Sequence, residues 1–199
     1  MKYINSVRGH FSEQAVFSVR DLAIFLSKKR ISKEYSYLLL HNLLRKGEIV
    51  RVSRGIYSFK KDPVHWGFAF SPFYYGLQES LSLRNLWEQE CIPVIITAKR
   101  VRPGLRGIAG SNILVRRIQR KAFFGFEMLK HHDCFVPVSD VEKTLLDFCY
   151  FREPLPENAL KNLLFKADEK KLRTYLQKYP KRFRKTIEKK MLEAKKERK

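Results

Sequence analysis

Five polar residues at helical spacing form the group most able to read another molecule: Lys33, Glu34, Tyr37, His41 and Arg45. On a predicted helix they fall on one side, where they offer cationic, acidic, phenolic and imidazole groups. Such a mixture can meet hydrogen-bond donors and acceptors in the major groove of DNA. The alternative is a solvated helix face without a ligand, and the neighbouring elements favour DNA.

The helix that carries these residues is predicted to begin after Ser32 and to end at Gly47. The Ser32 hydroxyl is expected to cap it by accepting an amide of the first turn, and glycine suits the left-handed residue that ends a helix. Leu39, Leu40 and Leu43 recur three and four apart, so they mark the face that packs inward.

A short basic β-hairpin is predicted directly after this helix. Ile49 should point inward, Val50 outward and Arg51 inward or edge-on, and residues 53–55 form the turn to a second strand at 56–59. Base contacts are expected from the helix, and phosphate contacts from the hairpin and Ser32. The predicted DNA-binding residues are Ser32, Lys33, Glu34, Tyr37, His41, Arg45, Arg51 and Arg54.

An earlier helix completes the unit. Ser18 is expected to cap it together with Asp21, and Leu22, Phe25 and Leu26 form its apolar stripe. Another short helix is expected within residues 1–15. Two helices followed by a basic hairpin are typical of a winged helix-turn-helix, which we assign to residues 1–62.

The net charge of +21 over 199 residues predicts a polyanionic partner, because each cation near a phosphate releases counterions. Charge alone does not choose between DNA, RNA and an acidic protein. The three cysteines are widely spaced and suggest buried thiols in a reducing compartment. Apolar runs are too short to span a membrane and no signal-peptide core is evident, so we expect a cytoplasmic protein.

After a linker at about 60–67, residues 68–199 are predicted to form an α/β domain with a small sheet flanked by helices. A helix is expected from Ser71-Pro72 through Trp87, and a capping box of Ser139 and Glu142 should begin another. The remaining expected elements are strands at 92–97, 112–119, 122–126 and 135–138, a basic loop at 99–107, and helices at 157–167 and 169–179. The whole chain is therefore expected to be of the α/β (α+β) class.

The basic tail, residues 181–199, holds ten lysines and arginines and three glutamates. It is predicted to be a helix that docks through Phe183, Ile187 and Met191, with mobile last residues. We expect it to add nonspecific affinity for DNA, because lysines contact phosphates and carry little base information.

A second candidate basic surface is predicted in the C-terminal domain. An RNA-binding or protein-interaction module and a merely solvated surface are both compatible with it. Its residues are Lys99, Arg100, Arg102, Arg106, Arg116 and Arg117.

Signals for catalysis are weak. Asp140, Glu142 and Lys143 suggest a metal-dependent nuclease, but such groups normally project from a strand, and here they start a helix. The run from His131 to Cys134 resembles a metal cluster, although a surface turn is the favoured interpretation. We therefore expect no catalytic residue, no metal and no cofactor.

Several motifs resemble the AbiEi-type antitoxin regulators of abortive-infection (type IV toxin–antitoxin) systems. They are Val16–Leu22, Leu43–Gly47, Arg54–Tyr57, Tyr75–Leu81, Thr97–Arg100, Phe124-Gly125 and Glu142–Asp147. The resemblance implies a phage-defence protein that binds double-stranded operator DNA and represses its own operon. It also implies functional pairing with a nucleotidyltransferase-type toxin, with the antitoxic effect carried by the C-terminal domain. The oligomeric state is left open.

Overall fold

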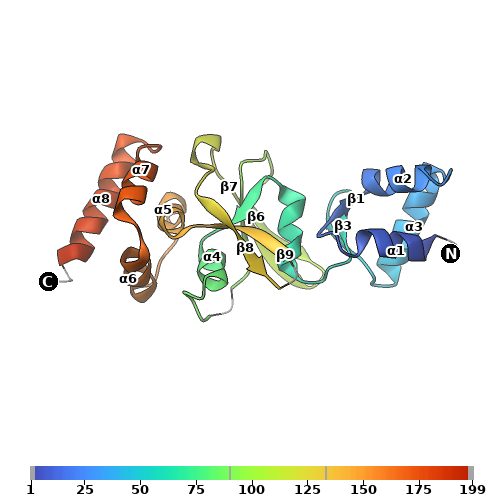
Figure 1. Ribbon diagram of the computed structural model, residues 1–199, viewed down its shortest axis with the longest axis horizontal. Helices are drawn as coiled ribbons and strands as arrows, with labels where there is room; N and C mark the ends of the chain where they lie inside the picture. Colours follow the sequence, from blue (N-terminus) through green and yellow to red (C-terminus); the bar gives the residue numbers. More distant parts are fainter. Residues whose placement is uncertain (1–2, 90, 133, 197–199) are drawn as a thin grey trace. The chain divides into compact units, whose positions relative to one another are not determined.

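The computed structural model describes residues 3–89, 91–132 and 134–196, which fold into two compact units (Figure 1). The first unit contains the chain up to Pro72 together with Leu105–Ile113. The second contains Phe73–Gly104 and the chain from Leu114 onward. Both helices and sheets are present, so the expected mixed α/β class is confirmed.

Three helices and a three-stranded sheet make up the N-terminal part of the first unit. The sheet has the order β1-β3-β2, and both of its pairings are antiparallel. The predicted helix-turn-helix and hairpin are therefore present, and β1 adds a strand that the sequence did not suggest. The elements are α1 (Ile4–Phe11), β1 (Phe17–Ser18), α2 (Val19–Ser27), α3 (Lys33–Arg45), β2 (Val50–Ser53) and β3 (Ile56–Ser58).

The core of this part forms where the predicted apolar stripes meet. Leu22 and Leu26 of α2 and the leucines of α3 are buried together with Val7 and Phe11 of α1. Each fully buried side chain of this kind stabilises the fold by roughly 1.5–3 kcal/mol. The packing fixes the angle between α2 and α3, and so decides which face of α3 meets solvent.

The segment expected to be a linker is instead packed structure. Pro63–Phe70 forms the 3₁₀ helix η1, which begins where the Asp62 carboxylate accepts the amide of Val64 at 2.9 Å. Trp66 is buried, and its indole N–H donates to the carbonyl of Lys60 at 3.0 Å. The prediction was wrong because the Asp-Pro pair starts a helical turn here, as proline at a first turn allows.

A six-stranded mixed sheet has the order β6-β7-β5-β4-β9-β8. Strand β4 is antiparallel to β5 and parallel to β9, β5 is parallel to β7, and β8 is antiparallel to β9. The strands are β4 (Phe73–Tyr75), β5 (Val94–Thr97), β6 (Gly104–Ile108), β7 (Ser111–Arg117), β8 (Phe126–His131) and β9 (Cys134–Ser139).

Four sequence predictions in this region were wrong in detail. The helix expected from Ser71-Pro72 is replaced by β4 and the short helix α4 (Gln78–Leu83). The basic loop at 99–107 includes part of β6, and the strand at 122–126 is replaced by η2 (Arg120–Ala122) and a connection to β8. The expected edge strand at 135–138 is β9, which lies between β4 and β8.

Four helices follow the sheet: α5 (Val141–Phe151), α6 (Glu157–Lys166), α7 (Glu169–Leu176) and α8 (Lys181–Lys196). Helix α5 packs against β9, α6 and α7, and α6 packs against α8. Ile187 of α8 is only 1% exposed, with Phe183 and Met191 beside it against the core. The predicted docking stripe of the basic tail is thus confirmed, while its last residues, 197–199, lie outside the described residues.

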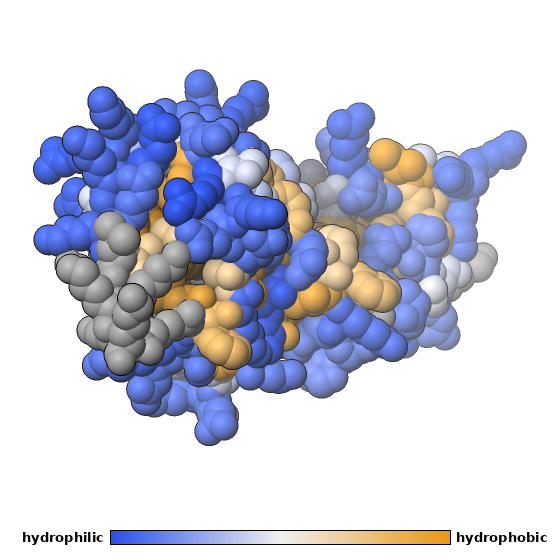
Figure 2. Space-filling model, turned by 60° about the vertical axis from the view of Figure 1, so that its left-hand side comes forward, coloured by the Kyte–Doolittle hydropathy of each residue, from blue (hydrophilic) through white to orange (hydrophobic). Residues whose placement is uncertain are grey.

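Figure 2 shows that hydrophilic residues cover most of the visible surface, with apolar residues reaching it in separate patches. Among the residues described, no helix combines the length and apolar character that crossing a membrane requires.

Candidate DNA interface

The outward face of α3 carries the predicted base-reading residues. All eight residues of the predicted DNA-binding site are exposed, whereas Leu39, Leu40 and Leu43 on the opposite face are buried. The helix is 13 residues long, or about 20 Å at 1.5 Å per residue, which matches the dimensions needed to lie in a major groove.

Both ends of the helix-turn-helix are held by backbone hydrogen bonds. At the C-terminus of α3, the amide of Gly47 donates to Leu44 O at 2.9 Å and that of Glu48 donates to Leu43 O at 3.0 Å. This is a Schellman motif, and it needs the left-handed φ of +65° that Gly47 adopts. The motif turns the chain at once into β2, so the hairpin lies directly after the predicted reading helix.

The turn of the hairpin is anchored to the start of α2. The amide of Val19 donates to the carbonyl of Gly55 at 3.0 Å, and Gly55 has a φ of +76°. Ser18 caps α2 with the capping box predicted from the sequence, in which its hydroxyl and the Asp21 carboxylate each accept a backbone amide. Arg54, at the tip of the hairpin, is therefore held next to a fixed helix start.

Arg51 departs from its predicted orientation. It is exposed, because Ile49 and Val52 take the buried positions and the pairing of β2 with β3 shifts register between Arg51 and Ser53. A bulge of this kind changes the alternation of side chains along a strand. The guanidinium consequently faces solvent, where a phosphate contact requires it.

Ser32 stands at the N-cap of α3, but its hydroxyl accepts no amide of the first turn. It bonds the Glu34 carboxyl instead. The pKa of Glu34 is lowered, first by a hydrogen bond from its own backbone amide and next by the one from Ser32. The predicted cap was therefore wrong, although Ser32 has the extended backbone of an N-cap residue.

The structure adds one residue that the sequence interpretation missed. Leu38 is 52% exposed and lies on the outward face, one turn after Glu34 and one turn before His41. Three consecutive leucines, 38–40, cannot all face inward on a helix that advances 100° per residue. Counting those steps from Leu39 and Leu43 places Leu38 outside, so the signal was present in the sequence.

A shallow groove of about 580 Å³ runs between α2 and the first turns of α3. Apolar side chains and the ring of Tyr37 form most of its walls, and Arg20 and Lys33 add positive charge. The lining residues are Val19, Arg20, Ala23, Ile24, Ser27, Ile31, Lys33 and Tyr37.

The second candidate basic surface is only partly assembled. Lys99 and Arg100 follow the end of β5, and Arg117 pairs in register with Thr97 at the same end of the sheet, so these exposed cations are neighbours. Arg116 is engaged by an ion pair with Glu153, and its guanidinium lies 5.8 Å from the Phe151 ring centroid.

The other two members stand apart from this group of cations. Arg102 is exposed on the connection between β5 and β6. Arg106 belongs to the first unit, where its guanidinium lies 5.1 Å from the Phe70 ring centroid.

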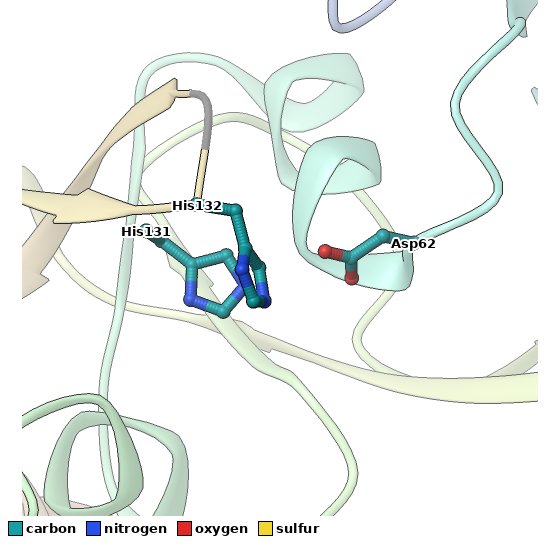
Figure 3. A group of neighbouring side chains, drawn as sticks. All are labelled: Asp62, His131 and His132. Carbon is teal, nitrogen blue, oxygen red and sulfur yellow. The ribbon is translucent and has the colours of Figure 1, made fainter.

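His131 is the last residue of β8, and His132 follows it in the turn of the β8–β9 hairpin. The ring centroids of His131 and His132 are 4.4 Å apart with the planes at 70° (Figure 3). Cys134 directs its thiol to the carbonyl of His131 at 3.5 Å, and Asp133 lies outside the described residues. Asp62, also drawn in Figure 3, belongs to the first unit, where it caps η1.

The acidic residues that suggested a nuclease have structural partners. Asp140, rather than Ser139, caps α5 by accepting the amide of Lys143 at 2.7 Å, and it also accepts the Tyr175 hydroxyl at 2.7 Å. Glu142 does not bond back to Ser139 as expected. It accepts the amide of Asp168 at 2.7 Å and pairs with Lys171 at 2.9 Å.

The third residue of that group, Lys143, is buried and paired with Asp147. Burial raises the pKa of Tyr175 to about 12, and the bond to Asp140 adds to the shift. The contacts of Asp140 and Glu142 with Asp168, Lys171 and Tyr175 therefore hold the start of α5 against α7.

Comparison with protein families gives a match over the part of the chain that contains α2, α3 and the hairpin. Residues 10–60 match the family described as "Transcriptional regulator, AbiEi antitoxin". Comparison with curated proteins finds no significant relative. The resemblance to AbiEi-type regulators is thus confirmed for residues 10–60, the segment that contains α2, α3 and the hairpin.

Proposed function

We propose that this protein is a sequence-specific DNA-binding repressor, and that it acts as the antitoxin of an abortive-infection toxin–antitoxin operon that it represses itself. The observation that carries the proposal is the exposed outward face of α3, with Lys33, Tyr37 and His41, beside the exposed Arg54 of the hairpin. This face lies within the segment that matches the regulator family. A mixture of hydrogen-bonding groups and cations suits base edges and phosphates.

In the proposed complex, α3 enters the major groove of double-stranded operator DNA. Lys33, Tyr37 and His41 contact base edges, and Arg51 and Arg54 contact phosphates of the adjacent backbone. The hydrogen bond from the amide of Val19 to the Gly55 carbonyl supports this division, because it ties the hairpin turn to the start of α2, which packs against α3.

We further propose a division of labour in which residues 1–62 read DNA and residues 68–199 carry the antitoxic effect. The partner in that second role is a nucleotidyltransferase-type toxin encoded in the same operon. The protein acts in the cytoplasm, where its operator is located. A nucleotidyltransferase-like gene beside the gene for this chain is the genomic observation that would support the pairing.

A gel-shift titration with the upstream region of the operon tests the DNA-binding role. A variant with alanine at Lys33, Tyr37 and Arg54 should lose specific binding. The matched control carries alanine at Phe165, Lys166 and Lys170. Like the first variant, it removes one exposed aromatic ring and two exposed positive charges. Unchanged affinity in the first variant, or equal loss in both, would refute the assignment of α3 and the hairpin.

A further inference from the structure

Three large apolar side chains are exposed on the helix-turn-helix. Ile24 of α2 is 49% exposed, and Tyr37 and Leu38 of α3 are 54% and 52% exposed. Leaving such side chains in water is unfavourable, since burying a leucine side chain contributes roughly 1.5–3 kcal/mol. Tyr37 and Leu38 lie on the face of α3 that carries the predicted base-reading residues, so their exposed surface is available to a ligand of that face.

Leu38 lies at the centre of the outward face. Glu34 precedes it by one turn, and His41 and Arg45 follow on the same side of α3. Its backbone is fixed, because the Asn42 side-chain amide donates to the carbonyl of Leu38 at 2.9 Å. A leucine held in this way is a small apolar projection among groups that form hydrogen bonds.

Tyr37 is the second apolar contact. Its ring lines the groove between α2 and α3 together with Ile24, and Arg20 and Lys33 line the same groove. An apolar surface bordered by cations is suited to DNA, where phosphates flank the edges of the bases.

The exposed lysines and arginines of α3 and the hairpin favour a polyanionic partner such as DNA. Lys33 and Arg45 lie on the same helix, and Arg51 and Arg54 on the hairpin beside it. Within a major groove, the C5-methyl group of thymine is the apolar feature that distinguishes one base from the other three.

We propose that Leu38 and Tyr37 recognise thymine C5-methyl groups in the operator, so that this protein selects its site by apolar contact as well as by hydrogen bonds. Leu38 contacts a methyl group opposite the middle of α3, and Tyr37 contacts one toward the start of α3. The inference rests on the proposed DNA-binding function and adds the chemical feature of DNA that the helix reads.

Replacing the operator thymines with deoxyuridine, one at a time, tests this inference directly. Each replacement removes one methyl group and leaves every hydrogen-bonding group of the base pair in place. For the wild-type protein, affinity should fall about fourfold at each of two thymines, the change that corresponds to one buried methyl group. The other thymines should give no change.

The variants assign each sensitive thymine to a side chain. Leu38→Ala should have the same affinity for the operator with thymine or deoxyuridine at one sensitive position. Tyr37→Ala should show the same equality at the other sensitive position. Met128→Ala, which truncates a side chain that is also 54% exposed but lies on β8, should keep the full fourfold preference at both.

The outcomes separate the inference from the proposed function. Specific binding by the wild type without any uracil-sensitive thymine would overturn the role of the methyl groups and leave the repressor intact. A preserved preference in Leu38→Ala and Tyr37→Ala would overturn it as well. Absence of operator binding by the wild type would refute the proposed function itself. Leu38→Gln, which keeps the length of the side chain, provides a second variant if Leu38→Ala folds poorly.

Discussion

The ammonium of Lys143 forms an ion pair with the carboxylate of Asp147 one turn later on α5, and neither side chain has exposed surface. Two tyrosines complete the arrangement. Tyr74 donates its hydroxyl to Asp147 at 2.9 Å, and Lys143 donates to the Tyr179 hydroxyl at 3.2 Å. Burial lowers the pKa of Lys143 and raises that of Asp147, while their mutual attraction opposes both shifts.

Lys143→Met should destabilise the second unit by roughly 3–5 kcal/mol, because it leaves the buried carboxylate of Asp147 without its cation. The double variant Lys143→Met/Asp147→Asn should lose less than the two single variants together, since an amide at position 147 can still accept the Tyr74 hydroxyl. Urea unfolding in a Trp66→Phe background measures this, because Trp87 is then the one remaining tryptophan. Losses that simply add would contradict a coupled pair.

Ser18 and Ser32 provide a matched comparison of two helix starts in one motif. Ser18→Ala should destabilise the first unit by about 1 kcal/mol, because it removes a side chain that accepts a first-turn amide. Ser32→Ala should have a smaller effect, since the Ser32 side chain makes no such bond. Thermal or urea unfolding followed through Trp66 in a Trp87→Phe background gives both values, and an equal loss would contradict the difference in capping.

The pH dependence of stability should include a contribution from Glu48. Arg8 donates to it at 2.7 and 2.6 Å, and these hydrogen bonds lower the pKa of the carboxyl below its ordinary value of 4.5. The stabilisation is therefore present above pH 4.5 and is lost as the pH falls through the lower folded-state pKa.

Glu48→Gln should accordingly reduce the fall in unfolding free energy between pH 5.5 and about 3, measured by urea unfolding at each pH. The exposed Glu13→Gln serves as the control and should leave that fall nearly unchanged. A Glu48→Gln variant with the same pH dependence as the wild type would show that the Arg8 contact contributes nothing.

The basic tail requires charge replacement rather than truncation, because removing the residues after Phe183 would also strip the buried Ile187 from the core. Replacing the exposed Lys181, Arg182 and Lys185 with glutamine should flatten the slope of log affinity against log salt by up to about 3. Specific and nonspecific DNA should weaken by the same factor, as phosphate contacts carry little sequence information.

The control for the tail replaces three exposed lysines outside α8, Lys130, Lys166 and Lys170, with glutamine. It should leave the salt slope near that of the wild type. A changed ratio of specific to nonspecific affinity in the tail variant, or an unchanged slope, would show that the tail does not act on phosphates.

The helix-turn-helix and its hairpin were predictable from local pattern, whereas η1 and the central sheet were not. Leu22, Leu26, Leu39 and Leu43 have helical spacing and lie on short helices that pack on each other, so spacing alone located the core. Strand β4 is buried on both faces and therefore lacks the alternation of a half-exposed strand. Its partners, β5 and β9, come from distant parts of the sequence, and pairing with them overrode the helical spacing of Phe73, Leu77 and Leu81.

The start of α5 shows how a local pattern can be offset by one residue. Ser139 and Glu142 match a capping box, but the helix begins one residue later, where Asp140 is the N-cap and its carboxylate accepts the amide of Lys143. Ser139 is the last residue of β9, and its hydroxyl lies 2.8 Å from that of Thr144. Because Ser139 is still part of β9, the N-cap of α5 falls on the next residue, Asp140. DNA contact by the eight exposed residues of the predicted site remains a prediction, and the gel-shift and deoxyuridine experiments test it.

The burial of Lys143 and Asp147 also bears on how loss-of-function alleles should be interpreted. Substitutions between Glu142 and Asp147 act on folding, so in cells they should lower the abundance of the protein through proteolysis. A genetic screen that tests the proposed antitoxin role by loss of toxin neutralisation should therefore recover them even if no partner touches this segment. Immunoblots of such alleles, normalised to transcript, separate depleted protein from protein that is present but inactive.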